Sequence, residues 1–150
     1  MTVTIQRELA ERITAAPRTK DYSALSVWMQ SQCDVEICRI MAPTVFWPRP
    51  KVESAILNVR LNAEKRARIP DRAYFQSFVR AMFFHRRKFL RSELLSCYKG
   101  RLDKPGVDRI LAEMGFVPET RAEELTVETL LSLCERMRRD FPSLDPDDGN

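Results

Sequence analysis

The stretch PTVFWPRPKVE, residues 43–53, separates two runs in which apolar and polar residues alternate. These runs, residues 35–41 (VEICRIM) and 54–61 (SAILNVRL), have the period of two that is typical of a strand with one buried face, with Ile56 as the exception. Pro48 and Pro50 fix the backbone φ angle and remove two hydrogen-bond donors, so the intervening stretch resists joining a sheet. We therefore expect two strands separated by a stiff, extended loop.

Two aromatic residues, Phe46 and Trp47, lie in this loop. A stiff loop at the C-terminal rim of an α/β sheet can hold an aromatic ring in place as a platform for a nucleobase, and stacking contributes ~1–3 kcal/mol per base. The alternative is that both rings pack against the domain, because large aromatic side chains are mostly buried. Spacing alone favours packing.

Upstream of the loop, the sequence predicts a strand that runs directly into a helix. Residues 2–5 favour β structure, and residues 6–13 are helix formers with Leu9 and Ile13 on one face. Such a unit normally lies in the middle of an α/β sheet, so we expect either an unusual fold or a missing front. Residues 22–33 form a second predicted helix.

Downstream, residues 62–68 are charged and predict an exposed linker. Beyond them the sequence has only helical periodicity. A wide apolar stripe is interrupted near His85, which leaves either one helix or two. Two further helices are predicted over residues 107–114 and 126–137, the first of them closed by Gly115.

The charge of the chain is mildly positive, because its 150 residues include 25 Lys and Arg against 21 Asp and Glu. The formal charge of +4 favours a polyanionic partner only if the cations cluster. A cluster is present and consists of Arg80, Arg86, Arg87, Lys88 and Arg91. Because acidic residues are absent across this stretch, we favour contact with RNA phosphates over a solvated helix face. Lys51 is a weaker candidate that is equally typical of a surface lysine.

The four cysteines form no CxxC pair, and His85 is the one histidine of the sequence. This composition argues against a zinc site and favours reduced thiols in a cytoplasmic protein. No apolar run approaches the ~20 residues that cross a bilayer, and the sequence starts without a basic-then-apolar secretion signal. We therefore expect no metal, no membrane partner and a cytoplasmic location.

Five segments of the chain resemble motifs of the small-subunit ribosomal RNA adenine dimethyltransferases, the KsgA family with its archaeal and eukaryotic relatives. They are residues 6–13 (QRELAERI), 22–27 (YSALSV), 46–55 (FWPRPKVESA), 78–91 (FVRAMFFHRRKFLR) and 121–126 (RAEELT). Leu9 stands where the family usually has valine. The segments follow the family's order at compatible spacings from Thr2 to about Met137, and together they are specific.

The resemblance implies an α+β fold in two parts. The last strands and helices of a truncated Rossmann-like methyltransferase sheet, residues 1–62, would precede a small all-helical RNA-binding domain, residues 63–140, and a disordered tail, residues 141–150. Family members begin with a half that binds S-adenosylmethionine at a glycine-rich turn and grips the target adenine with an Asn-Pro-Tyr motif, and neither motif is found in this sequence. We therefore expect the complete enzyme to use S-adenosylmethionine, and this chain alone to bind none and to be inactive.

The activity that the resemblance implies is dimethylation of adenosines of small-subunit ribosomal RNA, on a precursor of the small ribosomal subunit. Such an enzyme takes the base out of its stack and holds the amine in line with the methyl donor. By resemblance, Phe46 would stack on the target base, and Pro48 and Pro50 would support the loop. Lys51 and the basic cluster would bind the RNA.

Two other functions stay open. One is the related large-subunit ribosomal RNA adenine methyltransferase of the macrolide-resistance type, against which residues 86–88 and 121–123 argue. The other is a non-catalytic RNA-binding module of ribosome assembly, or a transcription factor. A truncated sheet would also expose strand edges and an apolar face, so we expect a chain that is poorly stable or associates with itself.

Overall fold

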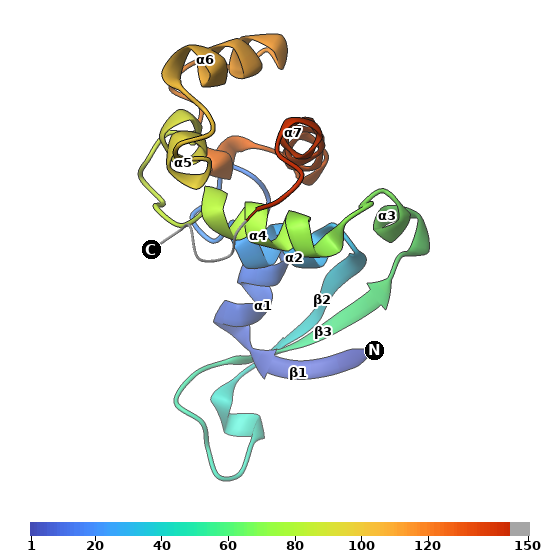
Figure 1. Cartoon of the computed structure of the whole chain (residues 1–150). Helices are drawn as coiled ribbons and strands as arrows, with labels where there is room; N and C mark the ends of the chain where they lie inside the picture. Colours follow the sequence, from blue (N-terminus) through green and yellow to red (C-terminus); the bar gives the residue numbers. More distant parts are fainter. Residues whose placement is uncertain (145–150) are drawn as a thin grey trace. The chain divides into compact units, whose positions relative to one another are not determined.

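The computed structural model describes residues 1–144 and has an α+β fold (Figure 1). The chain divides into two compact units, a sheet unit that comprises Met1–Arg68 and a helical unit that begins at Ile69. Every strand of the described chain lies in the sheet unit. The predicted α+β class is therefore confirmed, whereas the functional roles of the two parts stay predictions.

The sheet unit is built on three antiparallel strands in the order β1-β3-β2. Their bounds are β1 Thr2–Gln6, β2 Cys33–Met41 and β3 Ser54–Leu61. The central strand β3 has the bounds that its alternating sequence predicts, and the other two strands are slightly longer than predicted. In the described chain, β1 and β2 each pair only with β3, so both are edge strands.

Strand β2 contains a bulge at Cys38. The register pairs Ile37 with Leu57 and then Arg39 with Ile56, so that Cys38 has no opposite residue on β3. A bulge of this kind bends its strand and increases the local twist. The last residues of β2 are therefore turned before the chain leaves the sheet.

Helices α1 (Arg7–Thr14) and α2 (Ala24–Gln30) cover one face of the sheet (Figure 1). Ile13 of α1 belongs to a buried cluster with Leu57 and Val59 of β3. Partly buried apolar side chains pack against this cluster: Val3, Ile5, Leu25, Met29, Cys33, Val35 and Ile37. The core thus follows from the period-two pattern of the strands and the apolar face of α1.

The opposite face of β3 differs from the apolar surface that we expected of a truncated sheet. Its residues are Ser54, Ile56, Asn58 and Arg60, of which only Ile56 is apolar. Arg60 is exposed and the other three are half-buried. The expectation of an apolar open face is therefore wrong for this strand. Of the two exposed features that we expected, the unpaired edges of β1 and β2 are present in the described chain.

The predicted linker contains a short helix, α3 (Ala63–Ala67). The Asn62 side chain caps it by accepting a hydrogen bond from the Lys65 backbone at 3.1 Å. The same amide donates to the Asp34 carboxylate of β2 at 3.1 Å, and the Lys65 ammonium lies 2.9 Å from that carboxylate. A charged stretch that resembles a linker therefore folds against the sheet, because Asn62 supplies an N-cap.

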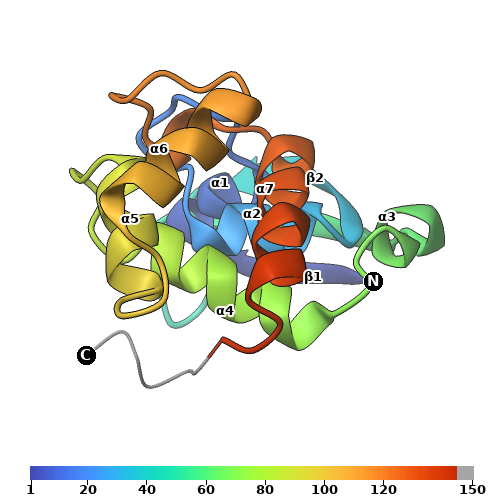
Figure 2. The same cartoon turned by 45° about the horizontal axis from the view of Figure 1, so that its top comes forward.

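The helical unit consists of α4 (Arg72–Met82), α5 (Leu90–Cys97), α6 (Lys104–Glu113) and α7 (Val127–Asp140). Figure 2 shows α5 between α4 and α6. The predicted interruption near His85 is real and separates α4 from α5. The apolar stripes of these helices are buried as predicted, and the largest buried side chains include Phe75, Phe78, Leu90, Leu94, Leu130 and Leu133.

Helix α6 begins three residues before its predicted start. The Asp103 carboxylate accepts a hydrogen bond from the Gly106 backbone at 2.8 Å, and Pro105 lies in the first turn, where a missing N–H costs nothing. Gly115 follows the end of the helix with a φ of 76°, as expected of a glycine that stops a helix. The apolar spacing alone therefore placed the end of this helix better than its start.

A buried chain of hydrogen bonds ties the end of α7 to α4. The Tyr74 hydroxyl donates to the Phe141 carbonyl at 2.8 Å and accepts from the Tyr98 hydroxyl at 2.8 Å. Burial raises the pKa of Tyr74 to about 12. Residues 145–150 of the predicted disordered tail lie outside the described residues.

Candidate nucleic-acid interface

The first candidate region is the connection between β2 and β3, residues 43–53, here called the proline segment. It begins with a 3-10 turn, Pro43–Val45, and continues without regular secondary structure to Glu53. The peptide bond between Trp47 and Pro48 is cis. Figure 1 shows the segment projecting from the end of the sheet opposite to α3. A 3-10 turn thus precedes the residues for which an extended loop was expected.

The two rings of the proline segment differ in exposure. Phe46 is half-buried and has an extended backbone, with φ of −113° and ψ of 149°, whereas Trp47 is 96% exposed. The chain bends at residues 46–48, so the two rings are not part of a regular strand. Packing therefore fails to explain Trp47, and part of Phe46 remains accessible.

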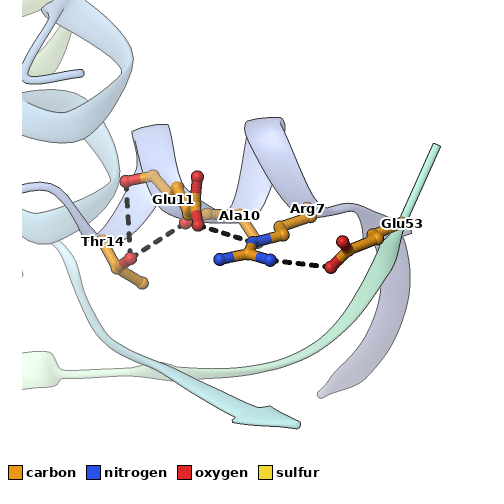
Figure 3. Close-up of polar contacts among 5 residues, drawn as sticks. All are labelled: Arg7, Ala10, Glu11, Thr14 and Glu53. Atoms are coloured by element: carbon orange, nitrogen blue, oxygen red, sulfur yellow. Dashed lines mark hydrogen bonds and ion pairs between the residues drawn. The ribbon is translucent and has the colours of Figure 1, made fainter. Parts of the chain in front are cut away.

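A polar network fixes the end of the proline segment to the start of α1 (Figure 3). The Arg7 guanidinium donates to the Glu53 carboxylate at 2.7 Å and to the Glu11 carboxylate at 2.8 Å. The Arg7 backbone N–H also donates to the Glu53 carbonyl at 2.9 Å. The hydrogen bonds to Glu11 and then Glu53 raise the pKa of Arg7. Exposed ion pairs contribute little to stability. The backbone hydrogen bonds of the adjoining strand β3 therefore do most to hold the end of the proline segment in place.

Lys51 lines an open hollow of about 460 Å³ in the sheet unit. The full lining is Gln6, Arg7, Glu8, Glu11, Pro43, Lys51, Val52 and Glu53. Three carboxylates accompany the two cations there, so the field around Lys51 is not purely positive. The carboxylates beside Lys51 therefore offset part of its charge, and its contact with RNA stays a prediction.

The second candidate region is the turn between α4 and α5, residues 83–89, here called the basic turn. It carries Arg86, Arg87 and Lys88, all of them exposed. The sequence suggested a helix face for these cations, and the structure corrects this, because the helical hydrogen bonds stop at α4. The neighbouring rings are Phe84, 63% exposed, and Phe89, 40% exposed. Three consecutive cations are thus flanked by exposed aromatic rings on one turn.

The predicted cations differ in how they are paired. Arg91 donates to the Asp108 carboxylate at 2.6 and 3.2 Å, which raises the pKa of Arg91 and lowers that of Asp108. The Arg86 guanidinium lies 3.7 Å from the Glu123 carboxylate. Among residues 1–144, no ion pair is found for Arg80, Arg87 or Lys88. These three cations are therefore the best placed to meet a phosphate.

A buried carboxylate supports the basic turn and was not expected from the sequence. Glu93 is 2% exposed, and its carboxylate lies 3.2 Å from His85 Nδ1. Desolvation raises the pKa of Glu93, and the nearby His85 opposes this shift. The only hint in the sequence is an acidic residue at helical spacing between Leu90 and Leu94, both of which are buried.

A second hollow, of about 470 Å³, lies in the helical unit and was also not expected. Its lining includes Arg101, Arg109 and Arg136 together with Asp103 and Asp140. Arg136 is held between Glu113 at 3.1 Å and Asp140 at 2.6 Å. Because its charges are mixed and its arginines largely engaged, this hollow resembles a stabilising network more than a ligand site.

No group of three His, Cys, Asp or Glu side chains within the described chain comes close enough to hold a metal ion. Across the same residues, no helix has the length and apolar character needed to span a membrane. The cytoplasmic location stays a prediction.

Comparison with known proteins places these regions in a family. Residues 1–137 match the model of the ribosomal RNA adenine dimethylases. The chain is 40% identical over 137 residues to ribosomal RNA small subunit methyltransferase A of Halothermothrix orenii, which covers 91% of this chain and 46% of the relative. It is 38% identical over 135 residues to the protein of the same name from Clostridium botulinum strain Loch Maree, covering 90% and 48%.

Two solved structures are also similar. A dimethyladenosine transferase from Plasmodium falciparum superimposes with a TM-score of 0.78 at 21% identity, over 93% of this chain and 57% of that one. The 23S rRNA methyltransferase ErmE superimposes with a TM-score of 0.57 at 26% identity, over 90% and 53%. The chain spans about half the length of the curated relatives it matches. With most of its residues matched, the chain belongs to the ribosomal RNA adenine dimethylase family.

Proposed function

We propose that this chain supplies the base-stacking and RNA-binding part of a methyltransferase that dimethylates adenosines of small-subunit ribosomal RNA during ribosome biogenesis. The observation that carries the proposal is the family match over residues 1–137, which include both the proline segment and the basic turn. The relatives from Halothermothrix orenii and Clostridium botulinum are small-subunit methyltransferases by name.

In this proposal the target adenine leaves its stack and lies against the accessible part of Phe46. An enzyme that modifies a base must extrude it, and the cost of unstacking is offset by contacts such as an aromatic ring. Pro48 and Pro50 restrict the backbone that carries the ring. The ring orients the base, and no side chain of the segment needs to act as a strong base.

Phosphate contacts come from the exposed cations of the helical unit. Arg87, Lys88 and Arg80 carry no ion pair among the described residues, so they can exchange counterions for phosphates without losing an internal partner. Arg86 and Arg91 contribute less, because Glu123 and Asp108 already balance part of their charge. Lys51 is the weakest of the predicted ligands.

S-adenosylmethionine is the methyl donor that the family resemblance implies for a complete enzyme. The strand-to-helix passage from β1 to α1 is formed by Gln6 and Arg7, without the glycine that lets a backbone approach a cofactor closely. That passage therefore lacks the close backbone approach that a donor cradle requires, and we infer that other residues hold the donor. We infer that β1, β2 and β3 correspond to the last strands of a Rossmann-like methyltransferase sheet. The structural likeness to the Plasmodium falciparum transferase supports this correspondence.

The decisive test is to titrate the chain with purified small-subunit and large-subunit ribosomal RNA at one fixed salt concentration. We expect tighter binding of the small-subunit RNA. Tighter binding of the large-subunit RNA would favour the alternative to which the similarity to ErmE points. An absence of RNA binding would contradict the proposal. Calorimetry with S-adenosylmethionine should give no stoichiometric binding, and a clear isotherm would overturn the assignment of the donor site to other residues.

We also propose that the chain associates with itself through its strand edges. Strands β1 and β2 each have one partner strand in the described chain, so their outer N–H and C=O groups can pair with another molecule. Sedimentation velocity at increasing concentration should show a growing dimer fraction. A monomer at every concentration would contradict this.

A further inference from the structure

Trp47 is the most exposed of the large apolar side chains in the described chain, at 96% of its free surface. An indole ring held fully in water is unusual, because aromatic rings carry a large part of the apolar surface that folding normally buries. The segment that carries the ring is anchored by the pairing of Met41 with Ser54. Exposed rings beside cations are the means by which proteins bind single-stranded nucleic acid.

The surroundings of Trp47 indicate the chemistry of its ligand. Arg49 and Lys51 follow at alternate positions, and both are exposed and without an ion pair in the part of the chain that the structure describes. Pro48 and Pro50 lie between them and offer no backbone donor that could pair with a strand. A flat apolar face next to cations fits a nucleobase with its phosphate, since every base has a π face and the phosphate needs a positive partner. A purely apolar protein surface would leave these cations without a partner.

Trp47 differs from Phe46 in its surroundings. Phe46 is half-buried, whereas Trp47 is 96% exposed. Two rings with such different exposure suit two different bases.

We propose that Trp47 is a second stacking site, which takes an unpaired base of the RNA other than the target base, with Arg49 binding a phosphate of the same strand. The inference rests on the proposed function and adds a ligand site to it. Its chemical class is single-stranded RNA with at least two accessible bases. The site also separates two energetic contributions, since stacking on Trp47 is insensitive to salt and the contact of Arg49 is not.

The test uses fluorescence of the full chain in a Trp28→Phe background, which leaves Trp47 as the one indole. Titration with a short unstructured RNA should quench the emission of Trp47, because a stacked base quenches an indole. Titration with inorganic polyphosphate provides the control, since it offers charge without bases and should leave the emission nearly unchanged. Circular dichroism should be the same for every variant of Trp47, because this side chain supports no packing.

Three variants then distinguish stacking from general apolar contact. Trp47→Leu keeps an apolar side chain without a π face, and we expect the Kd for the RNA to rise about 5- to 150-fold. Trp47→Phe retains a smaller ring and should lose less. Val45→Ala serves as the matched control, because Val45 is 62% exposed on the same segment and has no ring. Its Kd should stay close to that of the parent.

Each outcome decides the question. If Trp47→Leu binds like the parent while Phe46→Ala binds weakly, the inference is wrong and the proposed function survives. If the parent chain binds no RNA, both are wrong. If the emission of Trp47 shifts with protein concentration in the absence of RNA, a second copy of the chain covers the ring and the inference fails.

Discussion

The proline segment and the basic turn both combine aromatic rings with cations, yet they are built in different ways. The proline segment is anchored by a strand ladder at both ends, and its two cations carry no ion pair among the described residues. The cations in and beside the basic turn are divided, since Arg91 and Arg86 form ion pairs, whereas no ion pair is found for Arg87 or Lys88 among the described residues. A cluster of positive residues in a sequence therefore overstates the charge available to a ligand, because some of its cations are held in ion pairs.

The same comparison assigns different work to the two regions. Stacking depends on a ring held in one orientation, and the proline segment provides an anchored backbone. Phosphate binding depends on exposed charge that is not held in an ion pair, and the basic turn provides Arg87 and Lys88. Stacking in the proline segment should change little with salt, whereas phosphate contacts through Arg49 or the basic turn should weaken as salt rises.

The largest effect is expected for Phe46→Ala. Loss of the ring that we propose to stack on the target base should raise the Kd for small-subunit RNA about 5- to 150-fold. The slope of log Kd against log salt should stay unchanged, because no charge is removed. Fluorescence anisotropy at several salt concentrations measures both quantities. A change of slope without a change of Kd at low salt would contradict the division between the two regions.

The next largest effect is expected for the double variant Arg87→Gln, Lys88→Gln. Each lost phosphate contact should lower the salt slope by about 0.7 on a single strand, so the double variant should lose about 1.4. Lys99→Gln is the matched control, since Lys99 is an exposed cation of the same unit outside the basic turn. An equal loss of slope for Lys99→Gln would show that the basic turn has no special role.

Glu93 links the basic turn to stability through pH. Its folded-state pKa lies above the usual value of 4.5, because burial disfavours the charged carboxylate. Its contribution to folding is therefore fully present below about pH 4.5 and is lost as the pH rises through the folded pKa. Urea unfolding across this range should show a steeper loss of stability with rising pH for the parent chain than for Glu93→Gln. Parallel curves would contradict the role of Glu93.

The smallest effect is expected for Glu53→Gln. The Arg7–Glu53 ion pair is exposed, and such pairs contribute little. The backbone bond from Arg7 to the Glu53 carbonyl remains, so the Kd for RNA should stay within about twofold of the parent. A loss as large as that of Phe46→Ala would mean that the side-chain network, and not the strand ladder, positions the proline segment.

Much of the fold could be predicted from local patterns. Strand β3 and the start of α7 matched closely, because alternation and a threonine cap are encoded within a few neighbouring residues. Helix α3 was missed because a charged composition outweighed the cap signal of Asn62. The start of α6 was missed because its first turn, residues 104–106, has no large apolar side chain, although the Asp103 cap and a proline in the first turn mark a helix start.

The candidate site was harder to predict than the fold. The pairing of Arg91 with Asp108 joins residues 17 positions apart, and no local pattern encodes it. The burial of Glu93 and the exposure of Trp47 both run against the usual preference of their residue types. Glu93 and Trp47, whose burial is unusual for their residue types, are therefore residues that distinguish the basic turn from the proline segment.

The bulge at Cys38 gives one residue an influence beyond its own contacts. Because Cys38 has no opposite residue, Arg39, Ile40 and Met41 lie on the faces that a regular strand would assign to their neighbours. This offset sets the direction in which the chain leaves the sheet toward Phe46 and Trp47. Deleting Cys38 would restore a regular ladder and would rotate the backbone where it leaves β2. The position of both rings therefore depends on one residue of the strand.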